Sequence, residues 1–195
     1  NRIAAKVTFD EVHCPDEAAD SSRVLEKIYS MALSVYRETV YFDEVTGCLN
    51  RKSYENDLPG IRNRVNESGK ATCIMIDIND LKKTNDTYGH RFGDELIRET
   101  AELIRKQFSG TADVYRIGGD KFLLISLNAD TEDITLKLRQ MEADRKAVVL
   151  SDGEGISFAL GVAHFCEEDK SIDDTIKRAN AIMYANKQKK KKMRE

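Results

Sequence analysis

The apolar run at residues 71–78, ATCIMIDI, limits the possible folds more than any other segment of the chain. Its β-branched residues and short length predict a buried central strand, because a strand covered on both faces carries a continuous apolar run instead of an alternating one. The only charged residue of the run, Asp77, comes close to its end. The chain is therefore expected to build a sheet around this strand and to place an acid at the rim of that sheet.

The segments on either side of this strand predict an α/β fold. Amphipathic spacing predicts helices over 80–88, 92–108 and 131–145 and a last helix beginning near Ser171, while strands are expected over 113–117, 121–127, 146–150 and 155–165. Gly118 and Gly119 predict a two-residue hairpin turn with positive φ. The order β-α-β-β-α-β is the split βαβ pattern of ferredoxin-like, palm-like folds, with an antiparallel central sheet flanked by helices.

The N-terminal third divides into smaller pieces. Residues 1–16 are expected to be a tail or the end of a preceding domain, residues 17–42 a linker helix, and residues 43–195 the folded domain. Mostly apolar residues recur on the linker helix at alternating spacings of three and four, and this stripe fits either a coiled-coil seam or an amphipathic helix lying on its own domain. The residues are Leu25, Ile28, Ala32, Val35, Thr39 and Phe42. After turn residues at 43–51, we expect one helix that ends before Leu58-Pro59-Gly60 and a second, short helix up to about Glu67.

Charge and composition exclude several classes of protein. The net charge is −3, but six of the last nine residues are basic, so residues 1–186 carry a net charge of −8 and make a poor nucleic-acid binder. No apolar run approaches the ~20 residues that cross a bilayer, so no membrane contact is expected of this fragment, which begins with Asn instead of Met. The four scattered cysteines argue against a zinc site or a disulfide framework and favour a cytoplasmic location.

Two acids are the candidates for chemistry. Asp77 ends the first core strand and Asp120 follows the Gly118-Gly119 pair. The first strand of a split βαβ sheet lies next to the third, so both acids can meet at one rim. Paired carboxylates suit Mg²⁺ and metal-assisted phosphoryl or nucleotidyl transfer. The alternative is that both acids merely end strands or cap helices.

Three segments, taken in order, identify a family. They are DEVTGCLNR at 43–51, the stretch from Asp77 to Asp94, and RIGGDKF at 116–122. Together they resemble the GGDEF domain of bacterial diguanylate cyclases, over residues 43 to about 188. The second segment departs from the family pattern by Asn79 in place of Asp and Leu81 in place of Phe.

The resemblance implies an enzyme that joins two GTP molecules into cyclic di-GMP and releases two pyrophosphates, with two chains facing each other as a homodimer. It also implies Mg²⁺ or Mn²⁺ as the cofactor and an upstream sensory domain connected through the helix at 17–42. The residues at the matching positions are Asp77 and Asp120 as catalytic acids, Asp77, Asp120 and the carbonyl of Ile78 for the metal, Asn85 and Asp94 for guanine, and Lys82 and Lys187 for the phosphates.

The signature itself is changed at one position. Gly118, Gly119 and Phe122 match the family, but Lys121 replaces a glutamate that belongs to the family's metal site. An ammonium repels a metal ion, so we expect either a cyclase of weakened activity or a catalytically degenerate module that binds GTP and dimerises. The opposing alternative is that Lys121 contacts the triphosphate directly and replaces part of a metal's role. A purely structural dimerisation piece is the third alternative.

Three other family positions are changed as well. The inhibitory R-x-x-D motif is replaced at Ser109 and Ala112, so no inhibitory product site is expected there. Lys191 takes the place of a family arginine. A planar guanidinium that can donate two parallel hydrogen bonds is thereby replaced by a compact ammonium group.

Overall fold

The computed structural model of the chain describes residues 18–151, 153 and 155–192, and the side chains of all of these except 18–22, 37, 38 and 191. The prediction for residues 1–16 lies outside this range. The chain divides into one unit that ends at Phe42 and a second that begins at Asp43. In the first unit, α1 (Ala18–Tyr41) confirms the helix expected over 17–42. Leu25 and Ile28 of its apolar stripe are more than half exposed.

The second unit is built on one mixed sheet of five strands. They are β1 (Leu49–Asn50), β2 (Thr72–Ile78), β3 (Asp113–Arg116), β4 (Lys121–Ser126) and β5 (Phe158–His164), in the spatial order β1-β3-β4-β2-β5. The central strand, β2, pairs antiparallel with both β4 and β5, whereas the short β1 pairs parallel with β3. The expectation that the first core strand lies next to the third is therefore confirmed.

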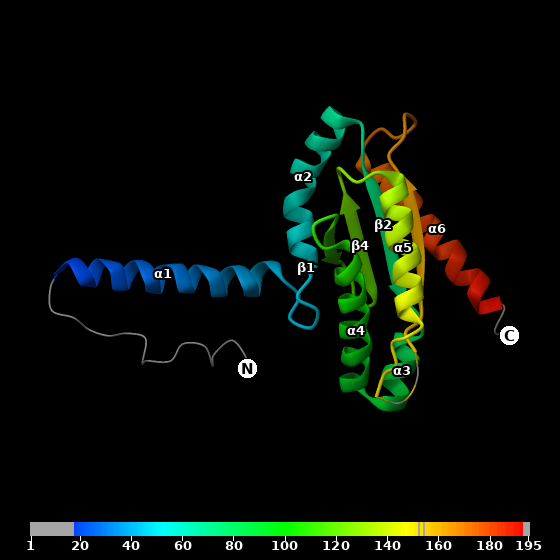
Figure 1. Ribbon diagram of the computed structural model, residues 1–195, viewed down its shortest axis with the longest axis horizontal. Coiled ribbons are helices and arrows are strands. Elements are labelled where there is room, and N and C mark those ends of the chain that lie inside the picture. Colours follow the sequence, from blue (N-terminus) through cyan, green and yellow to red (C-terminus); the bar gives the residue numbers. More distant parts are fainter. Residues whose placement is uncertain (1–17, 152, 154, 193–195) are drawn as a thin grey trace. The chain divides into compact units, whose positions relative to one another are not determined.

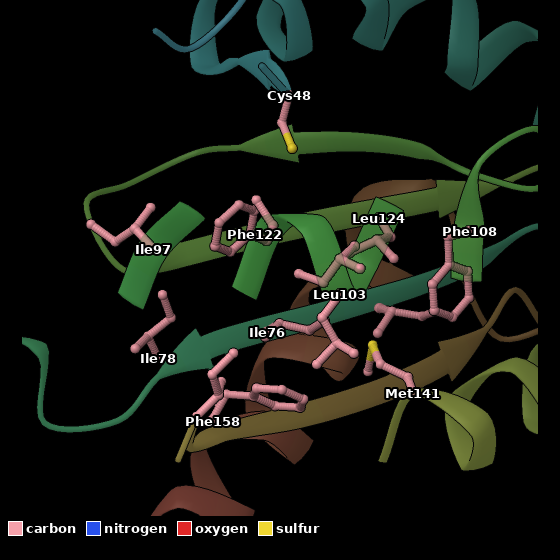
Figure 2. Close-up of a cluster of buried hydrophobic side chains, with 14 of the residues drawn as sticks. Cys48, Ile76, Ile78, Ile97, Leu103, Phe108, Phe122, Leu124, Met141 and Phe158 are labelled. Carbon is pink, nitrogen blue, oxygen red and sulfur yellow. The ribbon is translucent and has the colours of Figure 1, made fainter. Parts of the chain in front are cut away.

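Helices cover both faces of this sheet (Figure 1). The helices are α2 (Arg51–Ser68), α3 (Leu81–Tyr88), α4 (His90–Phe108), α5 (Thr131–Arg145) and α6 (Ile172–Lys192). Side chains of α4 and α5 form one buried cluster with one face of the sheet, and those of α2 and α6 form a second cluster with the other face. Figure 2 shows the first cluster, in which Phe108 and Met141 of the helices lie toward one end and Phe122 and Phe158 of the strands toward the other.

Alternation along β2 decides which way each side chain points. Ile74, Ile76 and Ile78 belong to the cluster with α4 and α5, whereas Cys73 and Met75 belong to the cluster with α2 and α6. Successive residues of a strand face opposite sides, so Asp77 continues the second row and faces α6. The sequence of β2 thus places its acid on the α6 side of the sheet.

Two expectations about local structure are wrong. Residues 51–68 form one helix through Pro59, because Ile61 and Val65 beyond it are fully buried and their burial compensates for the hydrogen bond that proline cannot donate. Residues 146–150 are not a strand but only a bridge between Val149 and Gly155. Nearby, the guanidinium of Arg145 donates to the carbonyl of Ile156 at 2.6 Å. This carbonyl is therefore bonded to a side chain and not to the backbone of a neighbouring strand.

The expected two-residue turn is also wrong. Neither Gly118 nor Gly119 has a positive φ. Residues 118–120 form a longer loop, which the N–H of Ile117 closes by donating to the carbonyl of Lys121 at 3.0 Å. The loop thereby carries Asp120 to the end of β2. Among the described helices, none is both long and apolar enough to span a membrane.

Candidate functional site

The site lies where β2 and β4 meet α6. Asp77 and Lys121 are direct partners in the antiparallel ladder, so their side chains emerge side by side on the α6 face. From the other side, Lys187 near the end of α6 donates to Oδ1 of Asp77. The Asp77 side chain is only 4% exposed. A nearly buried carboxylate is thus held between two ammonium groups.

The second predicted acid joins the same group. The carbonyl of Asp120 accepts from the N–H of Ile78 at 2.9 Å, which ties the hairpin loop to the end of β2. This bond brings the Asp120 side chain, which is 34% exposed, toward Asp77. The structure therefore brings Asp77, Asp120 and Lys187 together at the end of β2, and the expectation that the two acids meet at one rim is confirmed. Their roles toward a metal or a phosphate stay predictions.

Lys121 lies between the two acids. Its Nζ is 3.2 Å from Oδ2 of Asp77 and 3.4 Å from Oδ1 of Asp120. Burial lowers the pKa of Lys121, but its contacts with Asp77 and the charge of Asp120 outweigh this effect, so the net shift of the pKa is upward. Lys121 is therefore a stable cation at this position.

The acids present do not fit a metal site of three carboxylates. Within the described residues, no group of three His, Cys, Asp or Glu side chains is placed to hold a metal ion. The group holds two carboxylates, and the ammonium of Lys121 contacts both of them. Hard cations such as Mg²⁺ need oxygen ligands, and a lysine offers only donors.

The residues assigned to guanine lie on α3 and at the start of α4. Among the described side chains, Asn85 has a buried Oδ1 without a hydrogen-bond partner. A Cβ at Gly93 would lie only 1.9 Å from this oxygen, so the glycine makes room for the amide. Asp94 follows Gly93 just after the first turn of α4, and Lys82 is exposed on α3, one turn before Asn85. A buried acceptor left unpaired is costly, which indicates a place for a ligand donor.

The structure also shows a link that the sequence pattern could not reveal. Arg116 donates to both carboxylate oxygens of Asp43, at 2.8 and 3.0 Å, and its guanidinium also donates to the carbonyl of Gly119, at 2.8 Å for Nη2. Both residues stand in the motifs quoted above, but motif spacing says nothing about contacts between positions 73 residues apart. The first residue of the folded unit is thus joined directly to the loop that carries Asp120.

The contacts of Arg116 with Asp43 and Gly119 are expected to need the planar guanidinium of arginine, which has several N–H donors. The change Arg116→Lys keeps the charge but cannot make both contacts, so the free energy of unfolding should fall by about 2 kcal/mol, because the side chains of Arg116 and Asp43 are only 12% and 22% exposed. Urea denaturation would measure it. The control is Arg51→Lys, whose exposed pair with Glu55 should change stability by less than about 0.5 kcal/mol. Equal losses in the two variants would contradict the prediction.

Comparison with known families gives a match over most of the chain. The family described as "Diguanylate cyclase, GGDEF domain" matches residues 40–193. Among curated proteins, diguanylate cyclase DgcS of Shewanella oneidensis is 29% identical over 147 residues, which is 75% of this chain and 49% of that protein. Diguanylate cyclase VdcA of Vibrio cholerae is 27% identical over 162 residues, 80% of this chain and 46% of that protein. The chain therefore spans about half the length of these relatives.

A solved structure agrees with this match. The coiled coil and GGDEF domain of DgcB from Caulobacter crescentus, determined in complex with c-di-GMP, superposes with a TM-score of 0.75 at 27% identity. The match covers 87% of this chain and 92% of that one. The fold class expected from the sequence, an α/β domain with helices around a central sheet and an additional N-terminal helix, is thereby confirmed.

Proposed function

Because the chain belongs to the GGDEF domain family of diguanylate cyclases, we propose that it binds GTP and condenses two GTP molecules into cyclic di-GMP, more slowly than a domain with glutamate at position 121. The observation that carries the proposal is the meeting of Asp77, Asp120 and Lys187 at the end of β2. The ammonium groups of Lys187 and Lys121, which both contact these acids, suit a phosphoryl group. The cytoplasm, where GTP is made and used, is the location that we propose.

In the proposed reaction, the 3′-hydroxyl oxygen of one GTP forms a bond to the α-phosphorus of the other and gives up its proton to solvent water. The bond from that phosphorus to the bridging oxygen breaks, and pyrophosphate leaves with its electron pair. We propose that Lys187 and Lys82 contact the phosphates, because ammonium groups stabilise the charge that gathers on phosphate oxygens. The family match extends over Lys191, whose side chain lies outside the described part of the chain.

Guanine recognition is assigned to Asn85 and Asp94. The N1–H and N2–H₂ groups of guanine are donors, and they suit the carboxylate of Asp94 and the unpaired Oδ1 of Asn85. Adenine lacks the N1–H donor, so it would leave at least one of these acceptors unsatisfied. The pair should therefore prefer GTP over ATP.

Members of the family are in general metal-dependent nucleotidyl cyclases. The resemblance implies that Mg²⁺ or Mn²⁺ would bind to Asp77, Asp120 and the carbonyl of Ile78. The donor set described above does not fit such a site, because the ammonium of Lys121 contacts both carboxylates. The steps proposed for this chain therefore use its own side chains.

Productive condensation needs two chains, since each is proposed to bind one GTP. We propose that α1 pairs with its copy in a homodimer, using the exposed stripe that contains Leu25 and Ile28. Pairing would hold two half-sites close together, and an upstream sensory domain would control that distance. We propose no inhibitory product site at Ser109 and Ala112, because neither side chain carries the charge of the family's R-x-x-D motif.

A second function is favoured by Lys121. Its contacts with both acids would permit nucleotide binding without turnover, which would make the domain a GTP-binding, dimerising signalling module. The experiment that separates the two functions is incubation of the chain with GTP and Mg²⁺ or Mn²⁺, with the nucleotide products read by chromatography. The cyclase proposal expects cyclic di-GMP from the natural chain and faster formation by Lys121→Glu. Absence of product from both would contradict the proposal.

Gly93→Ala tests the guanine assignment. The new methyl group would displace the Asn85 amide, since its carbon would lie 1.9 Å from Oδ1. The obstacle is a side chain, so the fold should survive while GTP affinity falls about tenfold, and the preference for GTP over ATP should shrink. Calorimetric titration with each nucleotide measures both quantities. An unchanged GTP to ATP ratio would show that Asn85 does not contact the base.

A further inference from the structure

The position of the Lys121 ammonium has a consequence beyond a slower reaction. Nζ of Lys121 lies 3.2 Å from Asp77 and 3.4 Å from Asp120, so it bridges the two acids as a bound cation would. The hairpin loop is held in place by the bond between Ile78 and Asp120 and by Arg116. The bridge therefore comes from a tethered side chain at a defined register, opposite Asp77 in the ladder.

The sum of the charges at the site also indicates that Lys121 takes the position of a bound cation. Asp77 and Asp120 contribute two negative charges, and Lys121 and Lys187 contribute two positive ones, so these four side chains sum to zero. With glutamate at position 121 the sum would be −2. The difference of two charges equals the charge of one divalent ion. Lysine at this position thus balances the acids without a metal.

The same ammonium can also meet a phosphate. An ammonium has three N–H donors, and the contacts to Asp77 and Asp120 use two of them. The Lys121 side chain is 42% exposed and that of Lys187 is 33% exposed. Both ammonium groups can therefore contact a ligand in solvent while they stay paired with the nearly buried Asp77. A divalent ion bound to the same two acids would lie within a few Å of this ammonium and be repelled by it.

We propose that the ammonium of Lys121 is the resident cation of this site and takes the place of one divalent ion, so that the domain binds the triphosphate of GTP without a divalent metal. The proposal rests on the GTP binding proposed above. It makes position 121 the residue that determines whether nucleotide binding depends on metal. The ligand class is a nucleoside triphosphate in its metal-free form.

The test measures binding, not turnover. The full chain is titrated calorimetrically with guanosine 5′-[α,β-methylene]triphosphate, which cannot release pyrophosphate, once with EDTA and once with excess Mg²⁺. We expect the dissociation constants of the natural chain to agree within about threefold in the two buffers. In Lys121→Glu, binding in EDTA should be at least ~10-fold weaker than in Mg²⁺, because three carboxylates then face the phosphates with Lys187 as the remaining cation of the group. Lys121→Gln, which removes the charge without adding an acid, should also lose the metal-free binding. It serves as the test variant if Lys121→Glu does not fold.

A second readout uses the metal alone. Free Mn²⁺ is followed by electron paramagnetic resonance in the absence of nucleotide, and Lys121→Glu should bind the ion while the natural chain does not. The charge-matched control is Lys177→Glu, whose lysine is 77% exposed and stands ten residues before Lys187 on α6, about 15 Å along the helix. It should behave like the natural chain in both experiments.

The outcomes separate the two proposals. If the natural chain needs Mg²⁺ as strongly as Lys121→Glu does, or binds Mn²⁺ equally well, the resident-cation proposal is overturned while GTP binding stands. If the natural chain and Lys121→Glu both fail to bind the nucleotide in either buffer, the proposed function fails, and the resident-cation proposal fails with it.

Discussion

Replacing Asp77 with asparagine is expected to slow the formation of cyclic di-GMP by at least ~100-fold. Asp77 is the carboxylate on which Lys187 and Lys121 converge, and its side chain is only 4% exposed. Asparagine keeps the shape of the side chain but removes its charge, so Lys187 loses its ion pair and Lys121 is held by Asp120 alone. Initial rates, measured with GTP as the substrate, would show the loss.

The fold of this variant should survive. Lys121 keeps its contact with Asp120, and both lysines are exposed enough to be hydrated, so the melting temperature should move by no more than about 4 °C. Asp133→Asn is the matched control, because Asp133 is a half-exposed acid on α5 whose contact with Lys137 is 3.9 Å long. A rate for Asp77→Asn within tenfold of the natural chain would exclude Asp77 from the reaction.

Gly161→Ala is expected to destabilise the domain by about 3 kcal/mol, which for a chain of this length lowers Tm by roughly 6–12 °C. Gly161 lies in β5 between Ala159 and Ala163, on the face that packs against α6. A Cβ there would be 2.2 Å from the carbonyl oxygen of Ala179 and 2.3 Å from the backbone nitrogen of Met183. These are backbone atoms of α6, so the whole helix would have to move away from the sheet.

Displacing α6 would also carry Lys187 away from Asp77, so Gly161→Ala should lose GTP binding together with stability. Gly60→Ala is the control from another helix, because a Cβ at Gly60 would meet no atom within 4 Å. An alanine within α2 should raise stability by about 0.5–1 kcal/mol, since it restricts the unfolded chain. Thermal unfolding of both variants should therefore give shifts of opposite sign, and equal shifts would contradict the close approach of α6.

Much of the fold could be predicted from the chain's own pattern. The apolar run at 71–78, the helical spacing at 92–108 and the order of the elements predicted β2, α4 and the pairing of β2 with β4, and the structure confirms these. Local rules failed at Pro59 and at residues 146–150. In the first case burial of Ile61 and Val65 outweighs the penalty of proline, and in the second the segment packs without joining a ladder.

The candidate site divides in the same way. The periodicity and the order of the elements were enough to predict that Asp77 and Asp120 lie at one rim. Alternation along a strand decides which face a side chain takes, and the split βαβ topology decides which strands are neighbours, so few arrangements are possible. Sequence could not show that the Lys121 ammonium contacts both acids, that Lys187 meets Asp77 across 110 residues, or that Arg116 joins Asp43 to the loop. Those contacts depend on how closely α6 approaches the sheet and on where flexible side chains find opposite charge, and both are properties of the packed molecule.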